Sequence, residues 1–189
     1  LSILINLGYA YSSEEQNNQA LNSFKEALDY APKNSSDYYL ISGEIALLEG
    51  KPNAAQLSLN KAYEISPNDF QVNSSLTLFH LDLEDIAPYY VDYPKALTHA
   101  QKAYNNDPEK SEITKQNLAI AHFFNENYDK TISLLSTTNL SQHPYIAYWL
   151  GWAYIAKEDI PTAKIYFKKA VDAGVEGMEQ EVYDYLNLY

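Results

Sequence analysis

One arrangement of residues occurs twice, once near each end of the chain, with the same internal spacing. In residues 1–34 it consists of Leu7, Gly8, Tyr11, Ala20, Phe24 and Ala27. In residues 144–177 it consists of Leu150, Gly151, Tyr154, Ala163, Phe167 and Ala170. A recurring block of about 34 residues indicates a repeat protein, in which each unit packs on its neighbours to bury a continuous core.

Less regular copies of the arrangement fill the middle of the chain. Residues 36–69 keep the spacing with Gly43, Ala55, Leu59, Ala62 and Pro67. Residues 70–110 carry Ala96, Ala100, Ala103 and Pro108. These four are displaced by about seven residues, or nearly two helical turns. Residues 112–143 carry Leu118, Ala119, His122, Thr131 and Leu135. The chain therefore consists of about five units and a tail.

The pattern inside each unit predicts two packed helices. Phe24 and Leu28 follow the 3.6-residue period of an amphipathic helix. Small residues recur where two helices must approach closely, and Pro32 and Pro67 fall after the second helix of their units, which they end. No segment alternates apolar and polar residues, so we expect no β-strand.

This spacing resembles that of the tetratricopeptide repeat (TPR), a helix-turn-helix unit with the pattern W-x2-L-G-x2-Y, A-x3-F and P. The first Trp of the pattern is missing from every unit. The resemblance implies an all-α fold, a right-handed α-solenoid (superhelix) of about five TPR-like repeats plus a C-terminal helix near residues 177–189. We expect one solenoid domain over residues 1–189, with repeats at about 1–34, 36–69, 70–110, 112–143 and 144–177.

The two ends and the third unit depart from the pattern. In the tail, Val182, Tyr185, Leu186 and Tyr189 have helical spacing and would shield the last unit, although the tail could equally begin a sixth unit. Near residues 82–92 the third unit carries an insertion of about seven residues, where Pro88 favours a break in the helix. The insertion is either an acidic, Tyr-rich contact loop or a solvated connection. The first residue is Leu, so we expect a piece of a longer protein.

Charge excludes some classes of partner. The net charge is −12 and all 13 cationic residues are Lys, so the chain lacks the clustered cations and the Arg forks that bind phosphates. We expect neither nucleic acid nor an anionic membrane surface as a partner. No apolar run approaches the roughly 18 residues of a membrane span, so we expect no direct membrane insertion by this fragment. The compartment stays open, with cytoplasm favoured over periplasm.

The residues needed for chemistry are missing. The chain has no Cys, no glycine-rich phosphate loop and no serine-hydrolase or zinc-protease motif. His80 and His122 occupy the position that Tyr11 and Tyr154 fill in other units, so we interpret them as packing residues. His99 and His143 lack partners at metal-ligand spacing. We therefore expect no enzymatic activity, no cofactor and no metal.

The TPR resemblance implies that the first helices of successive units line a concave groove, where ligands bind. A helical wheel of about 100° per residue directs positions 2, 5, 9, 12 and 13 of each unit toward this groove. In the third unit, positions 5 and 9 are Ser74 and Leu78. Our candidate groove residues are Ile5, Tyr9, Leu40, Glu44, Leu78, Gln116, Ile120, Tyr145, Tyr148 and Trp152.

One TPR subfamily holds the terminal carboxylate of chaperone tails with Lys, Arg and Asn at positions 5 and 9. None of these positions is cationic or Asn in this chain, so we expect no chaperone-tail carboxylate clamp. The aliphatic and aromatic lining instead predicts a non-enzymatic scaffold that binds a peptide or partner protein of unknown identity. The alternatives are a regulatory or substrate-presenting domain of a larger enzyme or envelope complex, and a homo-oligomerisation module.

The segment YIAYWLGWAYIAKED, residues 145–159, shows how the two roles divide on one helix. Leu150, Gly151 and Tyr154 belong to the repeat framework, and Trp149 should pack against the preceding unit. Tyr145, Tyr148 and Trp152 are the members that we direct toward the groove.

Overall fold

The first helices of four repeats end in the same hydrogen-bonded turn, which sets the start of the second helix. The residue at repeat position 15 has a left-handed backbone in each case, with φ values of 57° at Glu15, 67° at Gly50, 60° at Glu126 and 62° at Glu158. The next amide donates back across the turn, as in Gln16 N–H to Tyr11 O at 2.9 Å. This is the Schellman arrangement, which satisfies carbonyls at a helix end.

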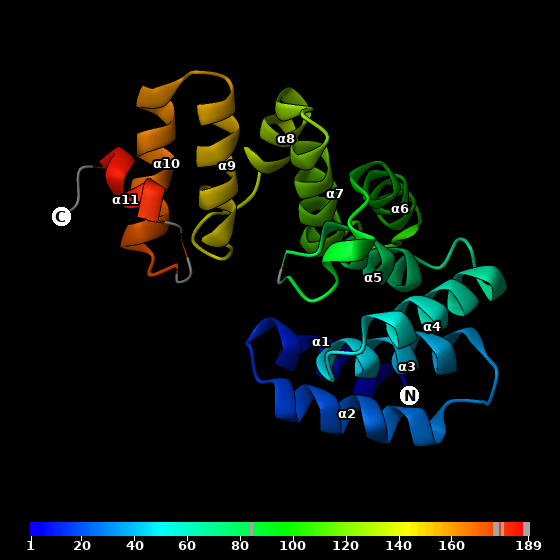
Figure 1. Ribbon diagram of the computed structural model, residues 1–189. Helices are drawn as coiled ribbons and strands as arrows, with labels where there is room; N and C mark the ends of the chain where they lie inside the picture. Colours follow the sequence, from blue (N-terminus) through cyan, green and yellow to red (C-terminus); the bar gives the residue numbers. More distant parts are fainter. Residues whose placement is uncertain (84, 176–177, 179, 187–189) are drawn as a thin grey trace. The chain divides into compact units, whose positions relative to one another are not determined.

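The computed structural model describes residues 1–83, 85–175, 178 and 180–186 (Figure 1). Over these residues the fold is all-helical, with eleven α-helices, one short 3-10 helix and no strand. The prediction of an all-α repeat fold is confirmed. The chain divides into two compact units, Leu1–Asp107 and Pro108–Tyr189, which we describe separately.

The first unit contains three helix pairs, in which each helix packs on the next along the chain (Figure 1). The helices are α1 (Ser2–Ser13), α2 (Asn17–Tyr30), α3 (Ser36–Leu48), α4 (Pro52–Ile65), α5 (Phe70–Leu81) and α6 (Tyr93–Asn106). Between α5 and α6 lies the 3-10 helix η1 (Pro88–Tyr90). The extra residues of the third repeat therefore do not lengthen α5 or α6, and their described part includes η1.

Small residues in the first helix of a pair make room for large ones in the second. A Cβ atom built on Gly8 would lie 2.6 Å from the ring of Phe24, and one on Gly43 would lie 2.7 Å from Leu59. Both partners are almost fully buried. Close helix approach thus explains the regular glycines of the sequence pattern.

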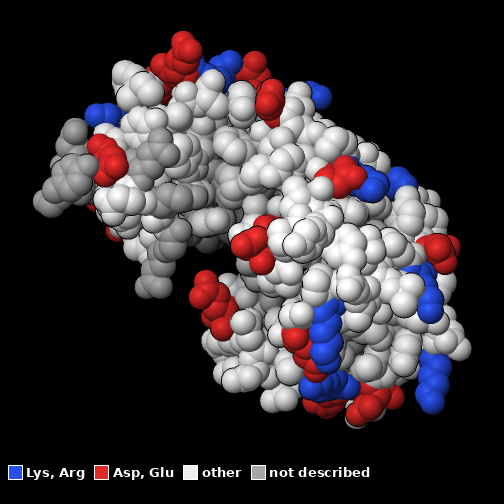
Figure 2. Space-filling model, viewed as in Figure 1, with Lys and Arg blue, Asp and Glu red and all other residues white. Residues whose placement is uncertain are grey.

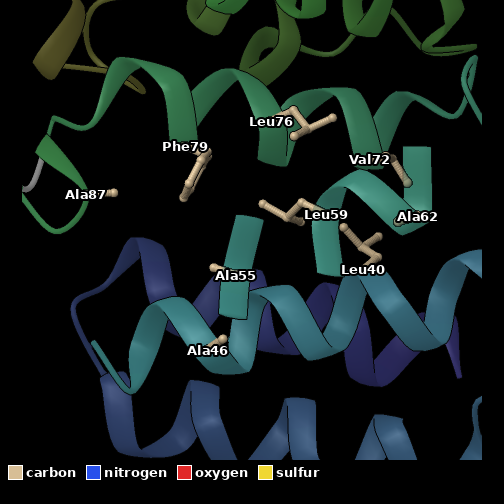
Figure 3. Close-up of a cluster of buried hydrophobic side chains, with 9 residues drawn as sticks. All are labelled: Leu40, Ala46, Ala55, Leu59, Ala62, Val72, Leu76, Phe79 and Ala87. Carbon is tan, nitrogen blue, oxygen red and sulfur yellow. The ribbon is translucent and has the colours of Figure 1, made fainter. Parts of the chain in front are cut away.

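The core of the first unit continues from one repeat into the next and includes the insertion. Side chains from α3, α4 and α5 meet in one apolar cluster, and Ala87 of the insertion joins it beside Phe79 (Figure 3). Ala87 is only 2 % exposed. Part of the insertion is therefore core structure.

The second unit contains two helix pairs and a final helix (Figure 1). The helices are α7 (Glu112–Phe124), α8 (Tyr128–Leu135), α9 (Tyr145–Ala156), α10 (Ile160–Asp172) and α11 (Gln180–Leu186). Helix α11 packs on α10, with Val182 fully buried and the Tyr185 ring 6.1 Å from that of Phe167. The final helix therefore covers part of the last repeat, which is one of the two roles that we left open for the tail. Tyr189, which we assigned to the same surface, lies outside the described residues.

Candidate interaction site

Two candidate residues, Tyr9 and Glu44, meet a third residue from the next first helix, Ser75, in the first unit. The Tyr9 hydroxyl of α1 donates to Glu44 Oε1 of α3 at 3.1 Å and lies 3.2 Å from Ser75 Oγ of α5. Ser75 Oγ also donates to Glu44 Oε1. We call Tyr9, Glu44 and Ser75 the polar triad. It ties the first three repeats together on the side of the unit formed by α1, α3 and α5.

The triad places a carboxylate where it is poorly solvated. Burial raises the pKa of Glu44 above its ordinary value, although the hydrogen bonds from Ser75 and Tyr9 work in the opposite direction. Burial and the neighbouring charge of Glu44 raise the pKa of Tyr9 well above its usual value. Among the described residues, no Lys or His forms an ion pair with Glu44.

A pocket of about 210 Å³ opens beside the triad. We call it the insertion pocket, because four of its lining residues come from the insertion. It is lined by Ser12, Asn17, Glu44, Leu47, Leu48, Ser75, Leu78, Phe79, Asp82, Leu83, Ile86 and Ala87. Apolar side chains form most of its wall, and its two charged residues are both carboxylates.

The wall that the insertion supplies is held in place by hydrogen bonds. Asp82 has a left-handed backbone, and its Oδ1 accepts the amides of Ile86 at 2.8 Å and Ala87 at 2.9 Å. At the far end, the carbonyl of Tyr90 lies 3.0 Å from His80 Nδ1, and the Tyr90 hydroxyl donates to Asn53. In the same insertion Tyr89 is 96 % exposed, whereas Ala87 is buried. The insertion therefore has one side packed on the core and one side in solvent.

The other candidates of the first unit differ in accessibility. Ile5 and Leu40 are 3 % and 1 % exposed and belong to the apolar core. Leu78 is 46 % exposed and lines the insertion pocket. Ser75, which the helical wheel directed toward the preceding repeat, makes the polar contact in place of its neighbour Ser74. The wheel direction of Ser75, toward the repeat that carries Glu44, is the sequence signal that could have identified this contact.

The second-unit candidates lie on α7 and α9. Ile120 and Tyr148 are each 6 % exposed, whereas Tyr145 is 46 % exposed and stacks on Tyr148 with ring centroids 5.4 Å apart. Trp152 is partly buried, with its ring 5.3 Å from that of Phe167. Gln116 is partly buried, and its Nε2 atom makes no hydrogen bond to a described residue.

Aromatic contacts join the two first helices of this unit. The Trp149 ring lies 5.3 Å from Phe123 and 5.6 Å from Phe124, both on α7. Trp149 itself is 6 % exposed. The prediction that Trp149 packs against the preceding repeat is confirmed.

The histidines of the first unit serve packing. His80 is 7 % exposed and stacks on His99, with ring centroids 5.9 Å apart. His99 Nδ1 lies 2.9 Å from Asn73 Oδ1, and burial lowers the pKa of His99 to about 4. This stack confirms the packing interpretation of His80. In the second unit His122 is also buried, at 6 % exposed. The described residues contain no group of three or more His, Asp or Glu that could hold a metal ion.

Most of the molecular face drawn in Figure 2 is uncharged, with acidic and basic side chains scattered over it. The described ion pairs, such as Lys25 with Glu49 at 3.2 Å, lie among partly or largely exposed side chains. Such pairs contribute little to stability. None of the described helices has the length and apolar character that crossing a membrane requires.

The sequence model of the tetratricopeptide repeat matches residues 1–34, 36–69 and 144–173, which together make up more than half of the chain. The chain belongs to the TPR family. No curated protein sequence matches it. TPR arrays generally mediate protein–protein interactions and are typically non-enzymatic.

Solved TPR structures share the fold over almost the whole chain. The type IV pilus biogenesis factor PilW is 21 % identical, with a TM-score of 0.67 over 99 % of this chain and 86 % of PilW. A thermophilic TPR protein from Thermus thermophilus, TTC0263, is 16 % identical, with a TM-score of 0.66 over 99 % of this chain and 97 % of its own. YrrB, described as a TPR protein with an unusual peptide-binding site, is 18 % identical, with a TM-score of 0.64 over 98 % of this chain and 91 % of YrrB.

Changing Glu44 to Gln should stabilise this TPR chain at neutral pH. Because its folded pKa is raised, the native state holds the Glu44 proton at pH values where the unfolded chain has lost it. The free energy of unfolding therefore falls as pH rises from the pKa of Glu44 in the unfolded chain to its pKa in the folded chain. Above both pKa values the destabilisation is complete. Gln removes the charge and keeps an oxygen for Tyr9 and Ser75.

The check is the thermal midpoint of both proteins as a function of pH. We expect the midpoint of E44Q to exceed that of the wild type at pH 7, and the difference to vanish below the unfolded pKa of Glu. Glu64→Gln, on the exposed side of α4, serves as the control and should show no such gap. A less stable E44Q at pH 7 would contradict the expectation.

Proposed function

We propose that this chain is a non-enzymatic TPR scaffold that binds a peptide or a segment of a partner protein through the candidate groove residues. The observation that carries the proposal is the exposure of large apolar side chains at predicted contact positions of both units. Leu78 and Tyr145 are each 46 % exposed. Isolated surface apolar residues are ordinary, but these two adjoin a pocket and an aromatic stack respectively.

The buried candidates have a different part in the proposal. Ile5, Leu40, Ile120 and Tyr148 shape and support the surface from below, while Leu78, Tyr145 and the accessible part of Trp152 supply contact area. Rigid aromatic side chains are favoured as contact residues, because they bury large areas at low cost in conformational entropy. The peptide-binding description of YrrB supports a peptide as the kind of ligand.

The test starts with a library of random twelve-residue peptides displayed on phage and selected on the full chain. An enriched peptide is then synthesised, and its affinity is measured by fluorescence anisotropy for Leu78→Ala and Tyr145→Ala. Each variant has a control of the same residue type, Leu57→Ala at 60 % exposure and Tyr30→Ala at 65 % exposure. These controls lie on second helices, α4 and α2.

We expect at least one test variant to weaken binding by about tenfold, the effect of losing a moderate hot spot, and both controls to stay within about twofold. All four substitutions are at the surface, so helicity and thermal midpoint should change little. Failure to enrich any peptide, or equal affinity for all four variants, would overturn the proposal. Sedimentation of the free chain addresses self-association: a monomer at all concentrations removes that alternative.

A further inference from the structure

The insertion pocket has the chemistry of a receptor for one positively charged side chain. Its volume of about 210 Å³ is below the range of about 300–1,000 Å³ that is usual for small-molecule sites. A pocket of this size accommodates a single side chain. Its apolar wall suits an alkyl stem, and the carboxylate of Glu44 suits a cationic end.

Glu44 is unexplained by the fold alone. Burial disfavours its charged form, and no described cation compensates for it. A neutral amide at this position would keep an oxygen acceptor for Tyr9 and Ser75 without burying a charge. Residues that cost stability in a fold are often kept for function.

We propose that the insertion pocket binds a lysine side chain of the partner peptide, with the ammonium group on Glu44. Lysine fits better than arginine because Glu44 Oε1 already accepts hydrogen bonds from Tyr9 and Ser75. Only Oε2 receives no hydrogen bond from a described residue, so a two-pronged guanidinium contact is blocked and a single ammonium contact is open. The stem of the lysine lies along Leu47, Leu78 and Phe79.

The insertion gives the pocket its specificity. Leu83, Ile86 and Ala87 close one side, and an uninterrupted repeat of about 34 residues would lack them. Asp82 holds this wall through the amides of Ile86 and Ala87 and adds a second negative charge. The contacts of Tyr90 with His80 and Asn53 fix the other end of the insertion, so the wall is formed before a ligand arrives.

The inference rests on the proposed function in one respect only, that the lysine belongs to a bound peptide. Its test therefore uses small probes and needs no peptide selection. Nα-acetyl-lysine N-methylamide is titrated into the 15N-labelled full chain, and amide shifts in nuclear magnetic resonance spectra report binding. Nα-acetyl-norleucine N-methylamide has the same stem without the ammonium group, and the arginine analogue tests the choice of cation.

We expect the lysine probe to shift the amides of Leu78, Phe79 and Ala87 and to bind about tenfold more tightly than the norleucine probe. Glu44→Gln should abolish that preference. Because E44Q is expected to be more stable than the wild type, unfolding would not explain the loss. Glu64→Gln removes one exposed charge elsewhere in the unit and should preserve the preference.

Three results would overturn the inference: equal binding of the lysine and norleucine probes, a preference that survives in E44Q, or shifts away from the pocket. Tighter binding of the arginine probe would overturn the choice of lysine. If Asp82→Asn removed the preference while E44Q kept it, the assignment to Glu44 would be wrong. In each case peptides could still depend on Leu78 or Tyr145, so the proposed function would stand or fall separately.

Discussion

Replacing Phe167 by Ala should destabilise the second unit by about 3–5 kcal/mol, the usual cost of removing a buried aromatic ring. Phe167 is fully buried on α10. Its ring contacts Trp152 of α9 at 5.3 Å and Tyr185 of α11 at 6.1 Å between centroids. The substitution therefore opens a cavity between three helices and removes the surface on which α11 packs.

Hydrogen exchange and thermal unfolding would measure this effect together. Because stability in a repeat array is a sum of local terms, amide protection should fall in α9, α10 and α11 before it falls in α1–α4. Ile165→Ala is the control, since Ile165 is 57 % exposed on the same helix and should change stability by less than about 0.5 kcal/mol. Equal losses for the two variants would contradict the packing that we describe.

Gly151→Ala should destabilise the chain by about 1–3 kcal/mol, the range found for overpacked cores. In most helices this change stabilises, because Ala has the higher helix propensity by about 1 kcal/mol. Here the added Cβ would lie 2.3 Å from the ring of Phe167. That ring is rigid and fully buried, so it cannot move aside without disturbing its other contacts.

A double-mutant cycle separates the steric effect from any general loss of stability. Phe167→Leu supplies a smaller side chain opposite Gly151, so G151A should cost less in the F167L background than in the wild type. The measurement is the midpoint of denaturant unfolding for the four proteins. A stabilising G151A in the wild-type background would show that the helices approach less closely than the structure has them.

The framework was predictable because its residues meet a requirement that acts over short distances. Gly8 and Gly151 recur where two helices cross, and Phe24 and Phe167 fill the space that they leave. Spacing along the chain is enough to detect such pairs, since both members belong to one repeat.

Accessibility at the candidate site could not be predicted in the same way. A helical wheel gives the direction of a side chain, whereas burial depends on what the neighbouring repeats place over it. Leu40 and Leu78 occupy related positions, yet Leu40 is 1 % exposed and Leu78 is 46 % exposed. The insertion pocket was equally hidden, because it forms only where Asp82, Leu83, Ile86 and Ala87 come to lie beside Leu78 and Phe79 of α5.

The recurrent turn at repeat position 15 shows that helix packing, and not the local residue, dictates the backbone there. Glu15, Glu126 and Glu158 adopt a left-handed conformation that costs a residue with a side chain about 1 kcal/mol. The second repeat has Gly50 at the same place, where that conformation is free of strain. Glycine at position 15, as in the second repeat, would therefore remove the backbone strain from the turns at Glu15, Glu126 and Glu158.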